Sequence, residues 1–461
     1  MPDLYRKSTH LLLIIIHVII GITGKYAPGV PGYFYLAVTI LFIYDIIIHR
    51  DRGARAGFYA LYIIGFEIVY RISGANIAWE AGKYFSIGIL LVGLIINQKR
   101  SFPWIFLLLF FLLIPALFLT SDPNPEDLRQ MIMFNLLGPV TLVLSGMYFY
   151  KRKVVENVYL NGLRFAFLPA FALVVVISLK SGLSGLQFIY VGSSPDAAGG
   201  FGANQVSTVI GWFLLMVLLF RIIGKNITPL VWLDWGMIAI LLIRGLVTLS
   251  RGGMMAFVIA FFMAFIVLWV KQSSFRRKTI KMMPYVIFGL FFFIGTIWYT
   301  NKITNNYLFY RYTGVTNSEL RTGIPAEDSS YLTGRDEIME GDIAAFKKFP
   351  ILGVGYGMAA KWHAIYFGHE AAAHTEYSRL LSENGMLGLI FMIISFVWLP
   401  VLYFLKTPSP LSRAFFVAFL FLSLLTMFHA AMRLALPGVL YGFSFMYSGL
   451  PGNSLKSRQF K

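Results

Sequence analysis

The sequence contains no cysteine and little charge, and both absences narrow what the protein can be. With no cysteine in 461 residues, disulfides, thiolate nucleophiles and thiolate metal sites are excluded. Only 13% of the residues are charged, whereas 58% are hydrophobic, and the mean hydropathy is +0.71. A soluble core cannot hide that much apolar surface. The composition therefore predicts a membrane protein.

Acidic residues are also scarce, because 21 of them face 39 lysines and arginines, for a net charge of +18. Anionic lipid headgroups at a membrane surface explain such an excess without any nucleic acid. We therefore expect membrane lipids, and no nucleic acid, among the partners.

Apolar runs of about 17–25 residues, the length that crosses the hydrocarbon layer as a helix, recur along the chain. They predict an all-α polytopic membrane protein with about 12–14 transmembrane helices. The first run lacks an A-x-A cleavage site, so we expect it to stay as a membrane helix. Two runs, 84–98 and 434–450, are short or glycine-rich and are interfacial or re-entrant alternatives. The candidate segments are 10–24, 31–49, 57–73, 84–98, 103–120, 131–150, 161–179, 204–223, 229–249, 253–270, 282–300, 386–405, 412–430 and 434–450.

Basic residues concentrate in alternate loops, which predicts the topology. Among these loops are those with Arg50, Arg52 and Arg55, with Lys151, Arg152 and Lys153, and with Arg276, Arg277 and Lys278. The alternation predicts cytoplasmic N- and C-termini and an outward-facing long loop. It divides the chain into a transmembrane domain (1–300), a large outward loop with short helices (301–385) and C-terminal transmembrane helices (386–461).

The long loop carries the most polar pattern. His374 precedes "TEYSRLLSENG", which predicts a helix that starts just after it. The positive end of that helix favours a neutral imidazole, the form that accepts a proton. Arg335 opens another loop helix, where a cation opposes the helix dipole. The stretch "HEAAAH" (369–374) fails the spacing of a zinc-binding H-E-x-x-H helix, so we expect no metal and no cofactor.

Further polar residues are expected on the same side of the membrane. Arg251 in "SRGG" lies where two apolar segments meet, and Arg244 precedes it by about two turns. Ionisable groups at such depth are functional hypotheses, and arginine suits phosphate oxygens. "GGFGANQ" leads into a helix at Asn204 and either lines a substrate path or is a turn. "GVGYG" around Gly355 either lets a partner approach the backbone or is a turn between helices.

The order "SRGG", "GR", "FPILGVGYG" and "HTEYSRLLSENGMLGL" resembles the O-antigen ligase and polymerase superfamily, which are bacterial GT-C type membrane glycosyltransferases. Thr375 follows the histidine where that family often has asparagine. The resemblance implies a place in the bacterial inner (cytoplasmic) membrane, with the active site of the 301–385 loop facing the periplasm. The resemblance further implies a glycan donor on undecaprenyl pyrophosphate and a sugar or lipid-linked acceptor. It also implies an essential loop histidine, matched by His374, and essential arginines, matched by Arg251 and Arg335.

Residue chemistry is compatible with that reaction. The arginines would neutralise the pyrophosphate leaving group, and His374 would act as general base in an inverting, metal-independent transfer. Expected substrate-binding residues are Arg244, Asn204, Gly355, Tyr356, Tyr377 and Glu383. Glu376 and Glu383 either orient the reacting groups or are acids on a helix surface. Arg379 has no assigned role and is expected to tolerate replacement. The alternatives are a transporter or flippase of polyprenyl-linked sugars, and a protein O-oligosaccharyltransferase of the same superfamily.

Overall fold

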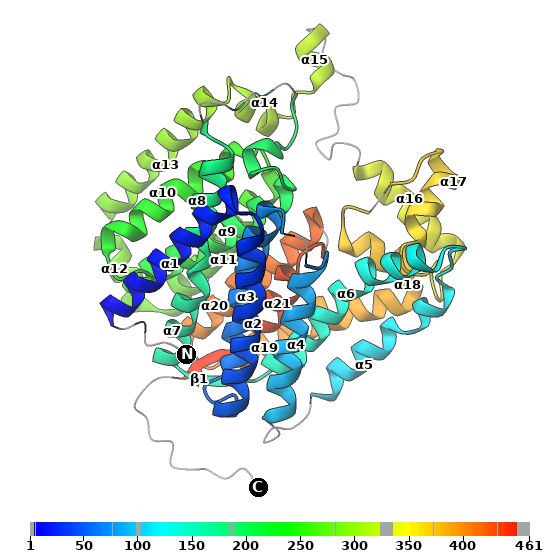
Figure 1. Cartoon of the computed structure of the whole chain (residues 1–461), viewed down its shortest axis with the longest axis horizontal. Coiled ribbons are helices and arrows are strands. Elements are labelled where there is room, and N and C mark those ends of the chain that lie inside the picture. The colour runs from blue at the N-terminus through cyan, green and yellow to red at the C-terminus, as the bar shows by residue number, and fades with distance from the viewer. Residues whose placement is uncertain are drawn as a thin grey trace.

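We describe the fold from a computed structural model. It covers residues 4, 6–75, 77–97, 103–183, 186, 188, 190–281, 283–322, 335–371, 373–430 and 432–449, with the side chains of 278, 281–288 and 335 outside the description. Figure 1 shows a bundle of helices with little else. In lipid, a helix satisfies every backbone hydrogen bond within one segment, so apolar runs fold this way.

The first part of the chain, up to residue 180, forms eight α-helices, one 3-10 turn and one short strand. They are α1 (Lys7–Tyr26), α2 (Gly29–His49), α3 (Arg55–Ser73), α4 (Ala81–Ile96), α5 (Trp104–Leu113), η1 (Pro115–Leu119), α6 (Pro125–Phe149), β1 (Lys153–Val155), α7 (Glu156–Phe167) and α8 (Pro169–Lys180). The buried helix α3 is the centre of this part, and it packs against α2, α4, α7 and α8.

The middle of the chain holds four long helices, α9, α10, α11 and α13, and the polar loop starts at the end of α13. The elements are η3 (Asp196–Ala198), α9 (Ala203–Ile222), α10 (Val231–Val247), α11 (Arg251–Lys271), α12 (Ser273–Lys281), α13 (Met283–Ile303), α14 (Tyr307–Thr313) and α15 (Asn317–Thr322).

The last part contains the remaining loop helices and the C-terminal membrane helices. The elements are α16 (Arg335–Lys348), α17 (Met358–Phe367), α18 (Glu376–Met392), the π-helical turn η4 (Ile393–Trp398), α19 (Leu399–Lys406), α20 (Pro410–His429), α21 (Leu436–Ser444) and β2 (Tyr447–Gly449). Strand β2 pairs in parallel with β1, with Val154 opposite Ser448.

Nine helices in the described part of the chain are long and apolar enough to cross a membrane. They are 7–26, 29–49, 55–73, 125–149, 156–180, 203–222, 251–271, 376–406 and 410–429. The expectation of an all-α polytopic membrane protein is confirmed. The predicted segments at 84–98 and 103–120 form shorter helices, since α4 has 16 residues and Pro115 separates α5 from η1.

In the segment 434–450, α21 has only nine residues and is buried. The N–H of Ala435, just before it, donates to the Glu67 carboxylate of α3 (3.1 Å). Tyr447, just after it, pairs with Lys153 at the lower end of the bundle in Figure 1. The segment therefore consists of the short helix α21 and the strand β2, and not of one long helix.

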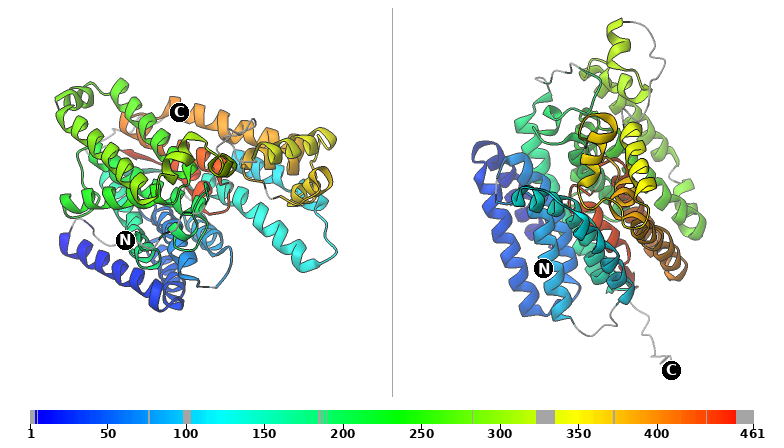
Figure 2. Two further views of the ribbon diagram at one scale, coloured as in Figure 1. Left: turned by 90° about the horizontal axis from the view of Figure 1, so that it is seen from above. Right: turned by 90° about the vertical axis from the view of Figure 1, so that its right-hand side faces the viewer.

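Contacts gather basic loops at one end of the bundle. Arg152 donates to Asp51 (2.7 Å), so the loops after α2 and after α6 touch, and the N–H of Tyr447 donates to the Arg152 carbonyl. At the opposite end in Figures 1 and 2 lie α14 and α15 of the long loop. Lys361 of α17 pairs there with Asp122 of the acidic loop. The charge alternation predicts that these two ends lie on opposite sides of the membrane.

Candidate functional site

His374 lies at the start of α18, as its position in the sequence predicted. Thr375 is the N-cap, and its hydroxyl oxygen accepts the N–H of Ser378 (3.1 Å). Such a cap fixes the first turn of a helix and therefore the direction of the residue before it. The half-buried His374 thus lies just before the positive end of the first part of α18, which runs from Glu376 to a break in helical geometry at Gly385.

A second histidine holds the segment in front of His374. The buried His363 of α17 has its Nδ1 2.7 Å from the carbonyl oxygen of Ala371 and its Nε2 3.1 Å from the carboxylate of Asp342. Ser378 donates to the same carboxylate (2.6 Å). Both ring nitrogens face acceptors, and only a doubly protonated imidazole donates through both. His363 therefore links α16, α17 and α18 under the His374 loop.

The pKa of His363 agrees with this geometry. Burial lowers the pKa, but the hydrogen bonds to Asp342 and to the Ala371 carbonyl outweigh burial, and the net shift is upward. Asp342 from α16 and Glu383 from α18 are the acids whose charges add to the rise.

Glu376, Arg379 and Glu383 form a buried ion cluster on one face of α18. Arg379 pairs with Glu376 and with Glu383 (2.9 Å), and it also donates to Asn135 of α6 (3.1 Å). All three side chains are at most 7% exposed. The two acids are therefore not surface residues, and the expectation that Arg379 tolerates replacement is wrong. Its loss would leave two carboxylates buried without their counter-ion.

The "GVGYG" turn packs against the same helix. Gly353, Gly355 and Gly357 all have positive φ, and a Cβ on Gly355 would come within 2.8 Å of the backbone of Leu119 and Thr120. The N–H of Gly357 donates to Glu383 (2.7 Å). The glycines thus allow a close approach between protein segments, which explains their presence without a ligand.

Two of the expected aromatic residues support this packing. Tyr356 is fully buried, and its hydroxyl donates to the Leu113 carbonyl (2.9 Å). The hydroxyl of Tyr377 donates to the carbonyl of Leu424 in α20 (2.8 Å). In this conformation, neither ring is presented as an open face for a sugar.

Arg251 is the first residue of α11, and the segments around it meet Asn204 as the sequence interpretation grouped them. Ser250 donates to the Asn204 side chain (2.8 Å), and Ser207 donates to Ser250 (2.8 Å). The two glycines after Arg251 are required by packing. A Cβ on Gly252 would lie 2.3 Å from the His429 ring, and one on Gly253 would lie 2.4 Å from the Ser207 hydroxyl.

The long loop comes back to Arg251 through α14. Local burial raises the pKa of Tyr312 to about 12, although 38% of the residue is exposed, and the positive charges of Arg251 and Arg311 oppose the rise. Arg311 is buried beside it. The two arginines are therefore near enough to one phenol to act on it electrostatically.

The other predicted arginines lie apart from this cluster or outside the described side chains. Arg244 is buried and donates to the carbonyl of Ser181 (2.7 Å), which ties α10 to the end of α8. Arg335 is the first residue of α16, and its side chain is not among those described.

The residues from His429 to Ala435, here called the connector, join the region around Arg251 to the region around His374. His429 lies against Gly252 and 3.0 Å from the hydroxyl of Thr208. The N–H of Met432 donates to Glu376 (3.1 Å). Arg433 donates to the carbonyl of Ala373, next to His374 (3.4 Å). The connector therefore touches the first turns of both α11 and α18.

Sequence reasoning missed Arg433. Burial and the nearby charge of Arg379 lower its pKa, so it belongs electrostatically to the α18 cluster. The available signal was an arginine in a short loop predicted on the side that is poor in basic residues.

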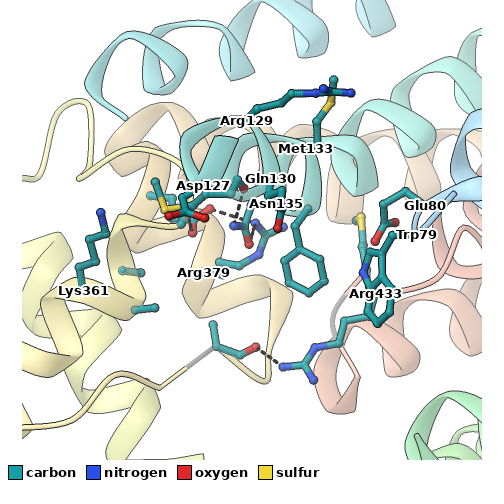
Figure 3. A pocket seen from close by; sticks show the side chains of 18 of the residues that line it. Trp79, Glu80, Asp127, Arg129, Gln130, Met133, Asn135, Lys361, Arg379 and Arg433 are labelled. Carbon is teal, nitrogen blue, oxygen red and sulfur yellow. Dashed lines mark hydrogen bonds and ion pairs between the residues drawn. The ribbon is translucent and has the colours of Figure 1, made fainter. Parts of the chain in front are cut away.

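A cleft of about 870 Å³ opens beside the connector. Figure 3 shows side chains from α6, α17, α18, the start of α4 and the connector around it. Of the nine predicted site residues only Glu383 lines this cleft, although Ala373 and Gly357 bring their neighbours His374 and Tyr356 next to it.

Comparison with known proteins gives one match. The family described as O-antigen ligase matches residues 236–393, which run from α10 to η4 and contain Arg251, Arg335 and His374. No curated protein and no solved structure matches the chain. The match over residues 236–393 supports the resemblance to the O-antigen ligase and polymerase superfamily.

Proposed function

We propose that the protein transfers a glycan from undecaprenyl pyrophosphate to an acceptor hydroxyl on the outer face of a bacterial inner membrane. One observation carries this proposal. His374 and Arg251 stand at the N-terminal ends of α18 and α11, and the connector contacts both ends through Glu376 and Gly252. A base and a cation at neighbouring helix N-termini suit the transfer of a group away from a pyrophosphate.

Arg251 is the residue that we assign to the leaving group. The first turn of α11 presents N–H groups and the positive end of a 21-residue helix dipole, and a guanidinium adds two-pronged hydrogen bonding to phosphate oxygens. Arg335, at the first position of α16, is assigned the same task from its match to the arginine of the resembled family. Charge that builds on the pyrophosphate would thus be neutralised by arginines, without a metal.

His374 is assigned as the general base. It would take the proton of the acceptor hydroxyl while that oxygen attacks the anomeric carbon from the side opposite the pyrophosphate, with inversion of configuration. The contacts of His363 and Thr375 fix the segment on both sides of it. A base that is held in this way keeps the orientation that proton transfer requires.

The experiment measures donor consumption by purified protein in detergent, with a lipid-pyrophosphate glycan as donor. His374→Ala is expected to lower turnover by roughly 10²–10⁴-fold, because a general base contributes about that factor. His369→Ala is the matched control, since His369 is an exposed histidine of the same loop. Near-normal turnover of His374→Ala, with His369→Ala inactive, would move the base to another histidine.

The same assay assigns the acceptor. It is run with lipid A core, with a second lipid-linked repeat unit and with a protein hydroxyl as separate acceptors. Product with one of them separates a ligase, a polymerase and a protein O-oligosaccharyltransferase.

A further inference from the structure

The cleft beside the connector has two walls of different origin. One wall comes from α17, from 370–373 and from α18, all inside the part of the chain that matches the O-antigen ligase family. The other wall comes from 78–84, from α6 and from the connector, all outside that part. A reaction shared by a family needs the first wall, whereas the second wall is free to select a substrate particular to this chain.

The charges in the cleft suit hydroxyl groups better than phosphates. Its lining contains six carboxylates against four cations, Arg129, Lys361, Arg379 and Arg433. The carboxylates are Glu80, Glu126, Asp127, Glu370, Glu376 and Glu383. Ionised carboxylates only accept hydrogen bonds and repel phosphate, while sugar hydroxyls donate to them.

One of these carboxylates has an unused oxygen. Glu80 is 4% exposed, and its Oε2 lies 2.8 Å from Lys83 Nζ. Its Oε1 has no hydrogen-bond partner among the described residues. Buried polar atoms nearly always have a partner, so an acceptor in the lining of a cleft indicates a donor that the cleft receives.

An aromatic surface stands next to this carboxylate. Trp79 is 70% exposed and Tyr84 is 39% exposed, and both line the cleft. The guanidinium of Arg71 packs 5.6 Å from the Trp79 ring centre and holds the ring in place. A large flat ring beside a carboxylate offers both an apolar face and a hydrogen-bond acceptor, the pair of features that a sugar ring needs.

The cleft reaches the residue before the proposed base. Ala373 and Arg433, which donates to the Ala373 carbonyl, both line the cleft. Figure 3 shows Arg433 beside Trp79, at the opposite side from Lys361. A ligand that stacks on Trp79 therefore extends toward the loop of His374. The volume of about 870 Å³ falls in the usual range of roughly 300–1,000 Å³ for ligand pockets.

We propose that this cleft binds the acceptor as a neutral saccharide, with Trp79 as the stacking platform and Glu80 as a hydroxyl acceptor. The proposal rests on the glycosyltransferase function above. In this proposal, the acceptor binds in the cleft and the pyrophosphate of the donor binds at Arg251.

The kinetic test compares Trp79→Ala and Glu80→Gln with the wild-type protein. Each is expected to raise the KM for the acceptor about tenfold and to leave the KM for the lipid-pyrophosphate donor and the slow donor hydrolysis without acceptor within about twofold. Trp232→Ala, at an exposed tryptophan of α10, and Glu337→Gln, at an exposed acid of α16, are the controls and should leave both constants unchanged. An unchanged acceptor KM, or an equal rise for the donor, would overturn the proposal.

A binding test works even if the transfer reaction is absent. Oligosaccharides released by mild acid from the surface polysaccharide of the producing cells are titrated into purified protein by calorimetry. We expect binding to the wild type that weakens about tenfold in Trp79→Ala and that inorganic pyrophosphate does not displace. No binding, equal binding to Trp79→Ala, or displacement by pyrophosphate would refute the saccharide site. Saccharide binding without donor consumption would instead reject only the proposed reaction.

Discussion

Two polar regions at the same end of the bundle differ in the kind of groups they bury. Around Arg251, the described contacts join an amide, hydroxyls and a histidine: Asn204, Ser207, Ser250, Thr208 and His429. On α18, they join two carboxylates to one arginine. On α18 the two acids neutralise the charge of Arg379, whereas the groups described around Asn204 and Ser250 are amide, hydroxyl and histidine side chains.

Under the proposed function, one protein handles an anionic donor and a neutral acceptor. We propose that the region around Arg251 receives the pyrophosphate, while the acid-rich cleft disfavours phosphate and receives the sugar. The connector between them carries one histidine to the first region and one arginine to the second.

The membrane topology decides whether the two polar regions face the outside of the membrane. Single cysteines at Ser318 on α15 and at Ser274 on α12, both exposed, are introduced into this cysteine-free chain. An impermeant maleimide on spheroplasts should label position 318 and leave position 274 unlabelled until the membrane is permeabilised. The reverse pattern would turn both regions toward the cytoplasm and end the proposal.

Removal of Arg379 should have the largest effect on stability. Arg379→Ala leaves Glu376 and Glu383 buried without their partner, which costs about 3–5 kcal/mol. The measurement is thermal unfolding in detergent, with Arg321→Ala on exposed α15 as the control.

A triple variant sharpens this result. Arg379→Met with Glu376→Gln and Glu383→Gln removes all three charges together and should lose less stability than Arg379→Ala alone. If Arg379→Ala unfolds within about one degree of the wild type, the cluster is not structural and its arginine belongs with the ligand-binding groups of the cleft.

Replacement of Arg251 tests the anion side. Arg251→Lys keeps the charge but loses the two-pronged donor, so turnover should fall about 10²-fold while the fold is retained. Arg321→Lys is the control for the same change at an exposed site. Full turnover in Arg251→Lys would show that only the net charge matters there.

The smallest expected effect is a pH dependence set by His363. Its pKa is raised in the folded protein, so the charged pair with Asp342 stabilises the loop fully below about pH 6.5. That stability is lost as the pH rises through the raised pKa. Protease cleavage of the 369–374 loop should therefore be faster at about pH 9 than at about pH 6, and His363→Gln should remove the difference. The pH dependence of His369→Ala should match that of the wild type, and a flat wild-type profile would show that His363 is neutral throughout.

Much of the architecture was predictable because long apolar runs have one solution in lipid. The helix after His374 followed from the sequence just behind it, and Asn204 and "SRGG", which the sequence analysis grouped together, are in contact. These features depend on residues near in sequence or on the shared side of a membrane.

Contacts between distant segments were not predictable. Nothing local distinguishes Arg379, paired in the interior, from an arginine on a helix surface. Arg433 and Glu80 reach the site only because α20, α4 and α18 pack together, a three-dimensional fact without a local pattern. The glycine turn was ambiguous for the same reason, since its partner proved to be α18 and not a ligand.

The bond between the Ala435 N–H and Glu67 joins residues 368 positions apart, and this separation has a consequence for biosynthesis. While the ribosome is still making the middle of the chain, α3 is already in the membrane with its carboxylate paired only with nearby groups such as Arg71. The partner arrives 368 residues later, in the same stretch that brings Arg433 and β2. A nascent chain released before this point therefore lacks these interior contacts, and quality-control proteases would encounter α3 before its environment is complete.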